Sequence, residues 1–291
     1  MEQMEDGRTE LILGAGGMLA RGLAAERPHA LSLGIRDLDI TDPAALARAV
    51  VPGVSIVWNA AADTRVDLAE TDPAHLAVND VAVGVLAGLC REAGALLVHV
   101  STDYVFDGRA GRAWREDDPV APVNAYGRGK LGGERRALES GAEVLVVRTS
   151  WVFAPGGVNF VDTMLDLAAS GKTELKVVDD QRGRPTFAPD LARALVTLVA
   201  AGARGVVHFA NAGETTWFGL AKETLARGGY PHVKIVPCTT AEFPRPAARP
   251  ANSVLDTSRY ERLTGAAPRP FTAALDEHLR LRAGAAEKAA G

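Results

Sequence analysis

Short apolar runs alternate with helical segments through the first half of the chain, and this alternation restricts the possible folds most strongly. Residues 11–13 form a short apolar run that leads through glycines into a helical segment, and residues 75–94 carry apolar side chains at helical spacing. Further strand candidates are HALSLG (29–34), VSIVWNAAA (54–62), ALLVHVSTDYVF (95–106) and AEVLVVRTSWVF (142–153). Strands alternating with helices predict an α/β fold with a Rossmann-type doubly wound parallel sheet. Ligands of such sheets bind beyond the carboxyl ends of the strands.

The character of the sequence changes after about residue 155, where proline-rich loops with helices between them take over. We therefore expect a dinucleotide-binding Rossmann domain over residues 8–155. A smaller C-terminal, mainly substrate-binding domain is expected over residues 156–285, partly interleaved with the first. Residues 286–291, rich in alanine and glycine, are expected to form a fraying tail.

Composition excludes several classes of protein. The 291 residues carry a formal net charge of -4, which leaves no basic footprint for nucleic acid. No apolar run approaches the length of a membrane span, and the acidic first residues are the reverse of a signal peptide. Cys90 and Cys238 lie far apart and predict reduced thiols in a cytoplasmic protein. The histidines are scattered without metal-ligand spacing, so no metal site is expected, and His99 is interpreted as a core or supporting residue.

A glycine-rich turn follows the first predicted strand. In GAGGMLA, Gly14 would permit the tight turn and Gly17 would let a pyrophosphate approach the backbone at a helix N-terminus. The acidic residue that holds the ribose of NAD at the end of the second strand is absent, since Gly34 stands there with Arg36 two residues on. This favours NADPH, with NADH possible, unless Arg36 is only a solvated loop charge; Asp39 is a candidate for the adenine side.

Tyr126 and Lys130 are four residues apart on a predicted helix, so both face the same side. The charge of Lys130 is expected to lower the pKa of Tyr126 and make it a proton donor for a developing alkoxide. Four glycines surround the pair, although each costs about 1 kcal/mol in a helix. Bare backbone there would let a cofactor, strand or partner helix approach closely.

Polar residues and a tryptophan follow two neighbouring strand candidates. Ser101 and Thr102 come directly after one run, where a hydroxyl can hold a substrate carbonyl. Trp151 lies just beyond the other and is expected to form an apolar wall of the substrate pocket, or else to fill a core between domains.

Seven motifs along the chain together resemble the dTDP-4-dehydrorhamnose reductase family of extended short-chain dehydrogenase/reductases. The motifs, in order, are GAGGMLA (14–20), NAAADT (59–64), STDYVFDG (101–108), NAYGRGK (124–130), RTSWVF (148–153), DQRGRPT (180–186) and RPANSVLD (249–256). The resemblance spans roughly residues 10–280. The missing acidic residue after the second strand and a short loop before Asp39 depart from the family pattern.

The resemblance implies roles for individual residues. The catalytic set would be Thr102, Tyr126 and Lys130. Besides Arg36, Tyr126 and Lys130, the cofactor contacts would be Gly14, Gly17, Met18, Leu19, Asp39, Ala62, Asp63 and Thr64. The substrate contacts would be Thr102, Asp103 and Trp151, with Arg184, Arg249 and Asn252 as further candidates.

The activity implied is NAD(P)H-dependent reduction of the C4 ketone of a dTDP-4-keto-6-deoxy sugar, leading to dTDP-L-rhamnose or a related antibiotic deoxysugar, by a monomer or homodimer. A nucleotide-sugar dehydratase or epimerase is one alternative. Dehydratases of this superfamily place Asp-Glu after the threonine, whereas Asp103 and Tyr104 follow Thr102 here. The other alternative is a non-catalytic NADP-binding subunit resembling the regulatory subunit of methionine adenosyltransferase.

Overall fold

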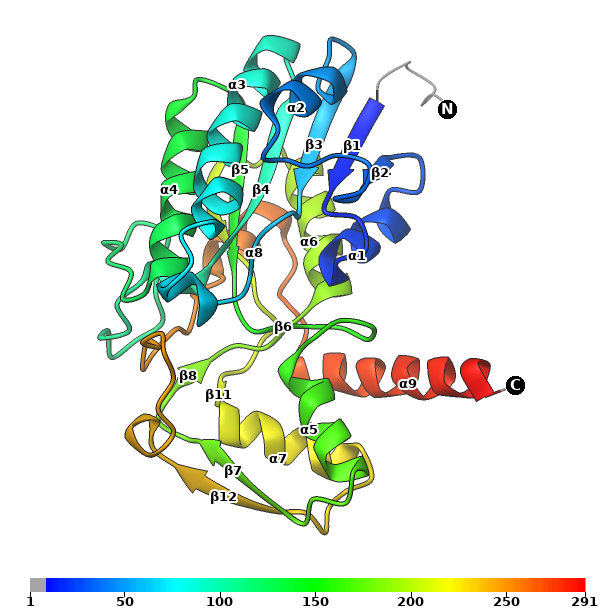
Figure 1. The fold of residues 1–291 in the computed structure, drawn as a ribbon, viewed down its shortest axis with the longest axis vertical. Coiled ribbons are helices and arrows are strands. Elements are labelled where there is room, and N and C mark those ends of the chain that lie inside the picture. Colours follow the sequence, from blue (N-terminus) through cyan, green and yellow to red (C-terminus); the bar gives the residue numbers. More distant parts are fainter. Residues whose placement is uncertain (1–8, 291) are drawn as a thin grey trace.

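A six-stranded parallel sheet forms the centre of the upper part of the molecule (Figure 1). The computed structural model describes residues 9–290, with side chains described through residue 285. The strands are β1 (Thr9–Leu13), β2 (Leu31–Leu33), β3 (Val54–Asn59), β4 (Leu96–Thr102), β5 (Val144–Thr149) and β10 (Gly205–His208). Their order, β2-β1-β3-β4-β5-β10, reverses direction between β1 and β3, which creates a crevice at the carboxyl ends of these two strands.

Helices cover both faces of this sheet, so the expected doubly wound α/β fold is confirmed. One face packs against α1 (Met18–Glu26), α6 (Ala188–Ala200) and α8 (Ser258–Thr264). The other packs against α2 (Pro43–Ala49), α3 (Ala82–Ala93) and α4 (Ala125–Glu139). Because both faces are buried, the central strands are almost continuously apolar, as in the VLVV stretch of β5.

A smaller lobe lies below the carboxyl ends of the strands (Figure 1). Its helices are α5 (Phe160–Ala169), α7 (Trp217–Arg227) and α9 (Phe271–Ala290). The strands β7 (Glu174–Val178) and β12 (Lys234–Cys238) pair in parallel beside α5 and α7. Short two-residue strands, β6 (Val152–Phe153), β8 (Arg182–Gly183), β9 (Thr186–Phe187) and β11 (Thr215–Thr216), line the junction.

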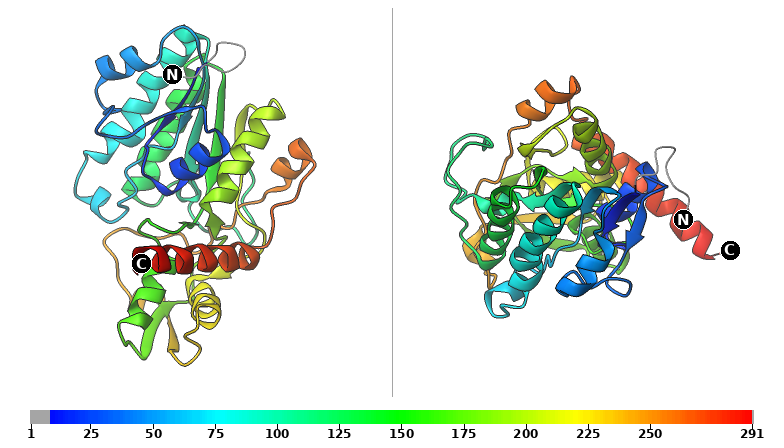
Figure 2. Two further views of the ribbon diagram at one scale, coloured as in Figure 1. Left: turned by 90° about the vertical axis from the view of Figure 1, so that its right-hand side faces the viewer. Right: turned by 90° about the horizontal axis from the view of Figure 1, so that it is seen from above.

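The chain passes between the two parts several times. After β5 it descends to the lower lobe, and it returns for α6 and β10, which pairs with β5 at the sheet edge. It then builds α7 and β12 below before α8 packs beside α6 above (Figure 2). Three elements that pack on the upper sheet thus fall within residues 156–285, and the domain limits at 155 and 156 stay a prediction.

The ends of the chain are only partly described. The polar start, residues 1–8, lies outside the described residues, as does Gly291. The backbone of residues 286–290, expected as a tail, continues helix α9. Over the described residues, every helix is too short or too polar to cross a membrane.

Candidate functional site

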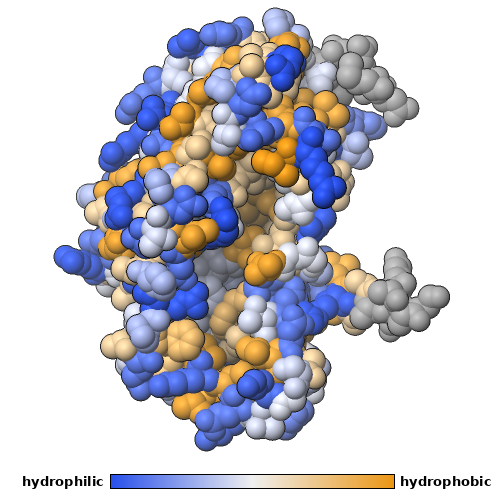
Figure 3. Space-filling model, viewed as in Figure 1, coloured by the Kyte–Doolittle hydropathy of each residue, from blue (hydrophilic) through white to orange (hydrophobic). Residues whose placement is uncertain are grey.

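Two adjoining cavities open at the carboxyl ends of the strands, where Figure 3 shows the surface hollowed between the upper part and the lower lobe. The larger, which we call the central cavity, has a volume of about 550 Å³, and the smaller, the side cavity, about 510 Å³. Both share Gly17, Ala60, Ala62 and Thr64 in their walls. The two cavities therefore form a continuous binding region at the crevice between β1 and β3.

The glycine turn after β1 lies at this junction. Gly14 has φ +88°, and a Cβ there would come within 2.8 Å of the backbone nitrogen of Ala61. Only glycine fits that backbone conformation without strain. Helix α1 begins directly afterwards with Gly17 as its N-cap, and Gly17, Met18 and Leu19 line the central cavity. The first-turn N–H groups of a helix form an anion site suited to a pyrophosphate.

The side cavity contains four further residues that were predicted to bind the cofactor. Asp39, Ala62, Asp63 and Thr64 line it. Arg36 is exposed and is absent from the lining of both cavities, although the preceding Ile35 lines the side cavity. Asp37 accepts a hydrogen bond from the Gly34 backbone nitrogen at 2.9 Å. The Asp37 carboxylate thus folds back onto the end of β2, although Asp37, like Arg36, is absent from the lining of both cavities. The absence of a ribose-binding acid there stays a prediction.

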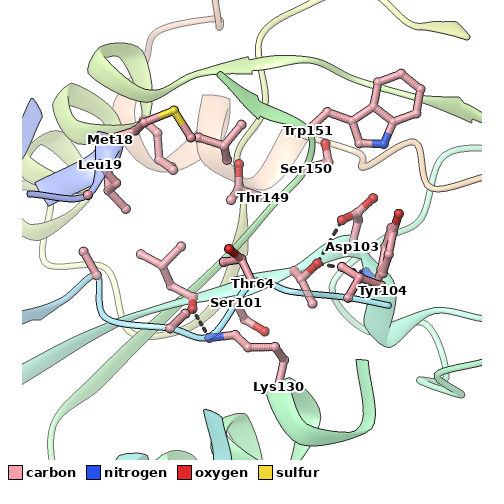
Figure 4. Close-up of a pocket in the computed structure, with 18 of the residues that line it drawn as sticks. Met18, Leu19, Thr64, Ser101, Asp103, Tyr104, Lys130, Thr149, Ser150 and Trp151 are labelled. Carbon is pink, nitrogen blue, oxygen red and sulfur yellow. Dashed lines mark hydrogen bonds between the residues drawn. The ribbon is translucent and has the colours of Figure 1, made fainter. Parts of the chain in front are cut away.

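Thr102, Tyr126 and Lys130 come together in the wall of the central cavity. Thr102 ends β4, whereas Tyr126 and Lys130 lie one turn apart on α4, which Asn124 caps by accepting the Gly127 backbone N–H. Lys130 is buried, and its Nζ donates to the Val100 carbonyl at 2.7 Å (Figure 4). The structure thus brings the three predicted catalytic side chains from two separate elements to one surface.

The charge environment of Tyr126 differs from the expectation. Burial, and then the carboxylate of Asp103, raise the pKa of Tyr126 above its usual value, and a hydrogen bond with Thr102 opposes them only partly. Burial also lowers the pKa of Lys130 to about 8, so this lysine carries less positive charge at neutral pH than an exposed one. The expected lowering of the Tyr126 pKa by Lys130 is therefore wrong for the ligand-free protein, in which Tyr126 is held as a phenol.

The glycines of α4 face protein rather than a cavity. A Cβ on Gly127 would overlap the Tyr104 carbonyl oxygen, and one on Gly133 would overlap the Asn79 carbonyl oxygen. A Cβ on Gly132 would lie 2.6 Å from the carboxylate of Asp80. Asn79 and Asp80 belong to the π-helical turn η2 (Ala77–Val81) that precedes α3. The glycines therefore allow two helical segments to pack backbone to backbone, one of the three possibilities left open by the sequence.

Asn79 also shapes the side cavity, and the sequence had not identified it. Its side chain is fully buried, accepts the Asp63 backbone N–H at 3.0 Å and donates to the Asp63 carbonyl at 2.8 Å. This clamp fixes the backbone that presents Ala62 and Thr64 to the cavities. Its position in a helical apolar pattern gave no signal, because its partner lies 16 residues away.

Asp103 is a buried acid beside the predicted catalytic hydroxyl. Thr102 donates to Asp103 Oδ1 at 3.0 Å, while Oδ2 has no hydrogen-bond partner among the described residues. Burial raises the pKa of Asp103 to about 7, although the nearby hydroxyls of Ser253 and Thr102 oppose this. Ser101 Oγ, which also faces the cavity, is likewise without a partner among the residues described. These polar atoms are suited to bind a polar ligand.

Trp151 forms the wall of the central cavity toward the lower lobe (Figure 4). Its backbone has φ +47°, which is unusual for a residue other than glycine. Its indole packs against Gly183, where any Cβ would overlap the ring, and stacks on Trp217 at the start of α7. Trp217 also lines the cavity. The sequence did not predict this, because Trp217 lies far from Trp151 along the chain.

The further substrate candidates lie outside the cavity walls. The guanidinium of Arg249 pairs with Asp67, and Arg184 donates to a threonine hydroxyl before α8 at 3.2 Å. The amide of Asn252 donates to two carbonyls in the 110–112 segment, at 2.7 and 2.8 Å. Neither cavity is lined by any of the three, and their roles in binding stay predictions.

Comparison with known proteins agrees with the motifs. The family model of the RmlD substrate binding domain matches residues 8–282. The dTDP-4-dehydrorhamnose reductase of Streptomyces griseus is 45% identical over 280 residues, covering 92% of this chain and 91% of that one. A probable dTDP-4,6-dihydroxy-2-methyloxan-3-one 4-ketoreductase of Streptomyces antibioticus is 43% identical, covering 92% of this chain and 93% of its own.

A solved structure is also similar. The crystal structure of the Bacillus anthracis dTDP-4-dehydrorhamnose reductase in complex with NADP superposes with a TM-score of 0.88 at 32% identity, covering 93% of this chain and 98% of that one. The resemblance carried by the seven motifs is thus confirmed. The chain belongs to the dTDP-4-dehydrorhamnose reductase family.

Proposed function

We propose that the chain catalyses the NADPH-dependent reduction of the C4 ketone of a dTDP-4-keto-6-deoxy sugar. The observation that carries this proposal is the convergence of Thr102, Tyr126 and Lys130 in one cavity wall, directly beside the glycine turn. The activity is that of the relatives at 43–45% identity, which are a dTDP-4-dehydrorhamnose reductase and a probable 4-ketoreductase.

The residues present fit a nicotinamide dinucleotide. Gly14 lets the turn pack against the backbone of residues 60–61, where a Cβ would clash, and the open N-terminus of α1 that follows is suited to the pyrophosphate. Asp39 and Thr64 would then border the adenosine half in the side cavity, and Lys130 would bind the nicotinamide ribose. When bound, the reduced nicotinamide supplies the hydride.

Each side chain of the set has a distinct role in the reduction. The Thr102 hydroxyl orients the substrate carbonyl, and Tyr126 donates its phenolic proton to the oxygen that develops negative charge at C4. The raised pKa of Tyr126 supports this direction of transfer, because a proton donor must begin the reaction protonated. Lys130 then stabilises the phenolate that Tyr126 becomes.

Cofactor preference is decided at the end of β2. Arg36 would pair with a 2′-phosphate across the loop, whereas the carboxylate of Asp37 would repel it unless it stays bound to the Gly34 N–H. We favour NADPH, with NADH as a weaker substitute, in line with NADP in the Bacillus anthracis relative.

Trp151 and Asp103 would contact the sugar, the former as an apolar wall and the latter through its partnerless oxygen. The product is dTDP-L-rhamnose or a related deoxysugar. We place the protein in the cytoplasm because Cys90 and Cys238 are free and buried. We expect it to act as a monomer or homodimer.

A direct test incubates the purified protein with dTDP-4-keto-L-rhamnose and NADPH or NADH and identifies the product by NMR. Conversion to dTDP-L-rhamnose, lost in Tyr126→Phe, supports the proposal. Stoichiometric NADPH binding without turnover of any dTDP-4-keto-6-deoxy sugar would instead support a regulatory subunit. Elimination of water from dTDP-glucose would support a dehydratase, although Tyr104 occupies the position of the required glutamate.

A further inference from the structure

The segment that joins β6 to α5, residues 154–159, extends to the start of α1, and we call it the strap. Two of its residues, Gly157 and Val158, line the central cavity together with Met18 of α1. Figure 4 shows Met18 at one end of this cavity and Trp151, where we propose that the sugar binds, at the other. The strap therefore belongs to the cavity wall near the glycine turn.

Arg21, in the first turn of α1, ties the strap to the glycine turn. Its Nη1 donates to the Gly16 carbonyl at 2.6 Å, and its Nη2 donates to the Pro155 carbonyl at 2.7 Å. A guanidinium presents its N–H donors in a rigid plane, so one side chain can hold two carbonyls at a fixed separation. Arg21 itself lines neither cavity, and any effect it has on the contents of the cavity passes through the segments that it holds.

The strap has a defined shape and packs closely on α1. A Cβ on Gly157 would lie 2.5 Å from Met18 Cγ, so only a glycine lets the strap approach this side chain as it does. The buried amide of Asn159 donates to the carbonyls of Ala154 and Gly157, at 2.9 and 3.0 Å. The strap is thereby folded on itself and pressed against the helix that follows the glycine turn.

This arrangement presents an apolar side chain to the cavity without covering it. Val158 lines the central cavity and is 98% exposed. An apolar side chain gains free energy when a ligand covers it, in proportion to the area removed from water. Gly17 and Lys130 line the same cavity, whereas no residue of the strap lines the side cavity. A dinucleotide with its adenosine in the side cavity would therefore meet the strap with its other half, from the pyrophosphate to the nicotinamide.

We propose that Arg21 is a positioning residue that holds the strap so that Val158 covers the nicotinamide half of the bound cofactor. The inference rests on the proposed function for the identity of this cofactor. Departure of the cofactor past the strap would require the strap to move away from α1, which breaks the contact between Arg21 and Pro155. Arg21 thus slows cofactor release without touching the cofactor.

The first test compares two probes by calorimetric titration. NADPH carries both halves of the cofactor, whereas 2′,5′-ADP carries only the adenosine half with its 2′-phosphate. Arg21→Met keeps the side-chain stem and removes both donors. It should raise the Kd of NADPH about five- to tenfold, with faster dissociation in stopped-flow fluorescence, and leave the Kd of 2′,5′-ADP unchanged. Arg48→Met, an exposed arginine on α2, is the control and should change neither.

Two results of this test would overturn the positioning role. Equal weakening of both probes would show that Arg21 only supports the glycine turn, and an unchanged Kd of NADPH would show that the strap does not cover the cofactor. A wild-type protein that binds neither probe would overturn the proposed function and, with it, this inference.

The second test separates the strap from the charge of Arg21. Val158→Ala removes the covering side chain, leaves the Arg21 contacts intact and should raise the Kd of NADPH about fivefold while sparing 2′,5′-ADP. Because both substitutions remove the same contact, the double variant should bind NADPH little more weakly than Arg21→Met alone. Effects that multiply in the double variant would show that Arg21 attracts the pyrophosphate by its charge, and would overturn its action through the strap.

Discussion

The indole rings of Trp151 and Trp217 lie face to face, with centroids 3.7 Å apart and planes 10° from parallel. Trp151 follows β5 of the large sheet, whereas Trp217 begins α7 of the lower lobe, so one aromatic stack joins the two parts at the cavity wall. The indole N–H of Trp217 donates to Gln181 Oε1 at 3.2 Å, which fixes the orientation of the Trp217 ring. Burial of two large apolar surfaces makes this contact a substantial part of the junction.

Replacing Trp151 with alanine should weaken substrate binding more than cofactor binding, because the ring lines the part of the central cavity where we propose that the sugar binds. We expect the KM for the keto sugar to rise at least about tenfold, as the loss of an aromatic wall is worth more than 1.4 kcal/mol. Steady-state kinetics with each substrate varied checks this, with Trp151→Phe as the conservative control. Equal increases in both KM values together with a lower Tm would indicate a purely structural role between the lobes.

Tyr126→Phe should keep the fold and lower kcat at least about a hundredfold, the usual effect of losing a general acid. Circular dichroism and NADPH binding verify the folded state, and stopped-flow oxidation of NADPH gives the rate. Tyr230→Phe, in the lower lobe and outside both cavity linings, is the control and should keep kcat. Near-normal turnover by a folded Tyr126→Phe protein would assign the proton donor to another group.

The protonation of Asp103 should make stability depend on pH with an unusual sign. Its pKa is raised to about 7 by burial, so between about pH 4 and pH 7 the native state binds more protons than the unfolded state. Stability contributed by this group is therefore present at low pH and is lost as pH rises through that window. The Asp103→Asn variant lacks this loss. Its unfolding free energy should therefore rise relative to that of the wild type as pH increases through the window, by at most about 1.4 kcal/mol per pH unit.

Urea denaturation of both proteins at pH 5, 6, 7 and 8 measures the effect. The difference in unfolding free energy should change steadily up to pH 7 and level off above it. Curves that stay parallel over the whole range would show that Asp103 ionises normally in the folded protein.

Two glycine-to-alanine substitutions should have opposite effects. Gly133→Ala places a methyl group against the Asn79 carbonyl, which cannot retreat without moving η2, and should destabilise the protein by about 2 kcal/mol or more. Gly88→Ala lies inside α3 with no atom within 4 Å of the new Cβ and should stabilise by about 0.4–1 kcal/mol. Thermal and urea unfolding give both values. A tolerated Gly133→Ala would mean that α4 and η2 are less tightly packed than the structure has them.

Arg36→Ala should weaken NADPH binding about ten- to a hundredfold and leave NADH nearly unchanged, since only NADPH carries the 2′-phosphate. Fluorescence titration with both cofactors measures this. Arg48→Ala, on α2, is the control and should change neither affinity. A preference for NADH in the wild type, or a preference for NADPH that persists in Arg36→Ala, would show that Arg36 is a solvent-exposed charge without a role in cofactor binding.

The sequence predicted the layout of the upper part well because the relevant signals are local. Each buried strand is an apolar run, and the residues just after it line the cavities, as Gly14 and Thr102 do. The contacts that the sequence did not reveal join distant segments. Trp217 stacks on Trp151, although the two lie 66 positions apart in the sequence. Asn79 binds Asp63 from a π-helical turn, which has no recognisable pattern of apolar residues. The pKa of Tyr126 also depends on burial and on Asp103, neither of which can be read from its spacing to Lys130.

The return of the chain to the upper sheet, where β10 pairs with β5, affects how the protein emerges during synthesis. The edge of β5 that later receives β10 has no partner strand until residues 205–208 have left the ribosome, by which time the segments of α5 and β7 have already been synthesised. An unpaired parallel strand is an exposed template for association with other chains. A nascent chain halted near residue 200 should therefore be caught by holding chaperones, and release should coincide with completion of the sheet rather than of either lobe.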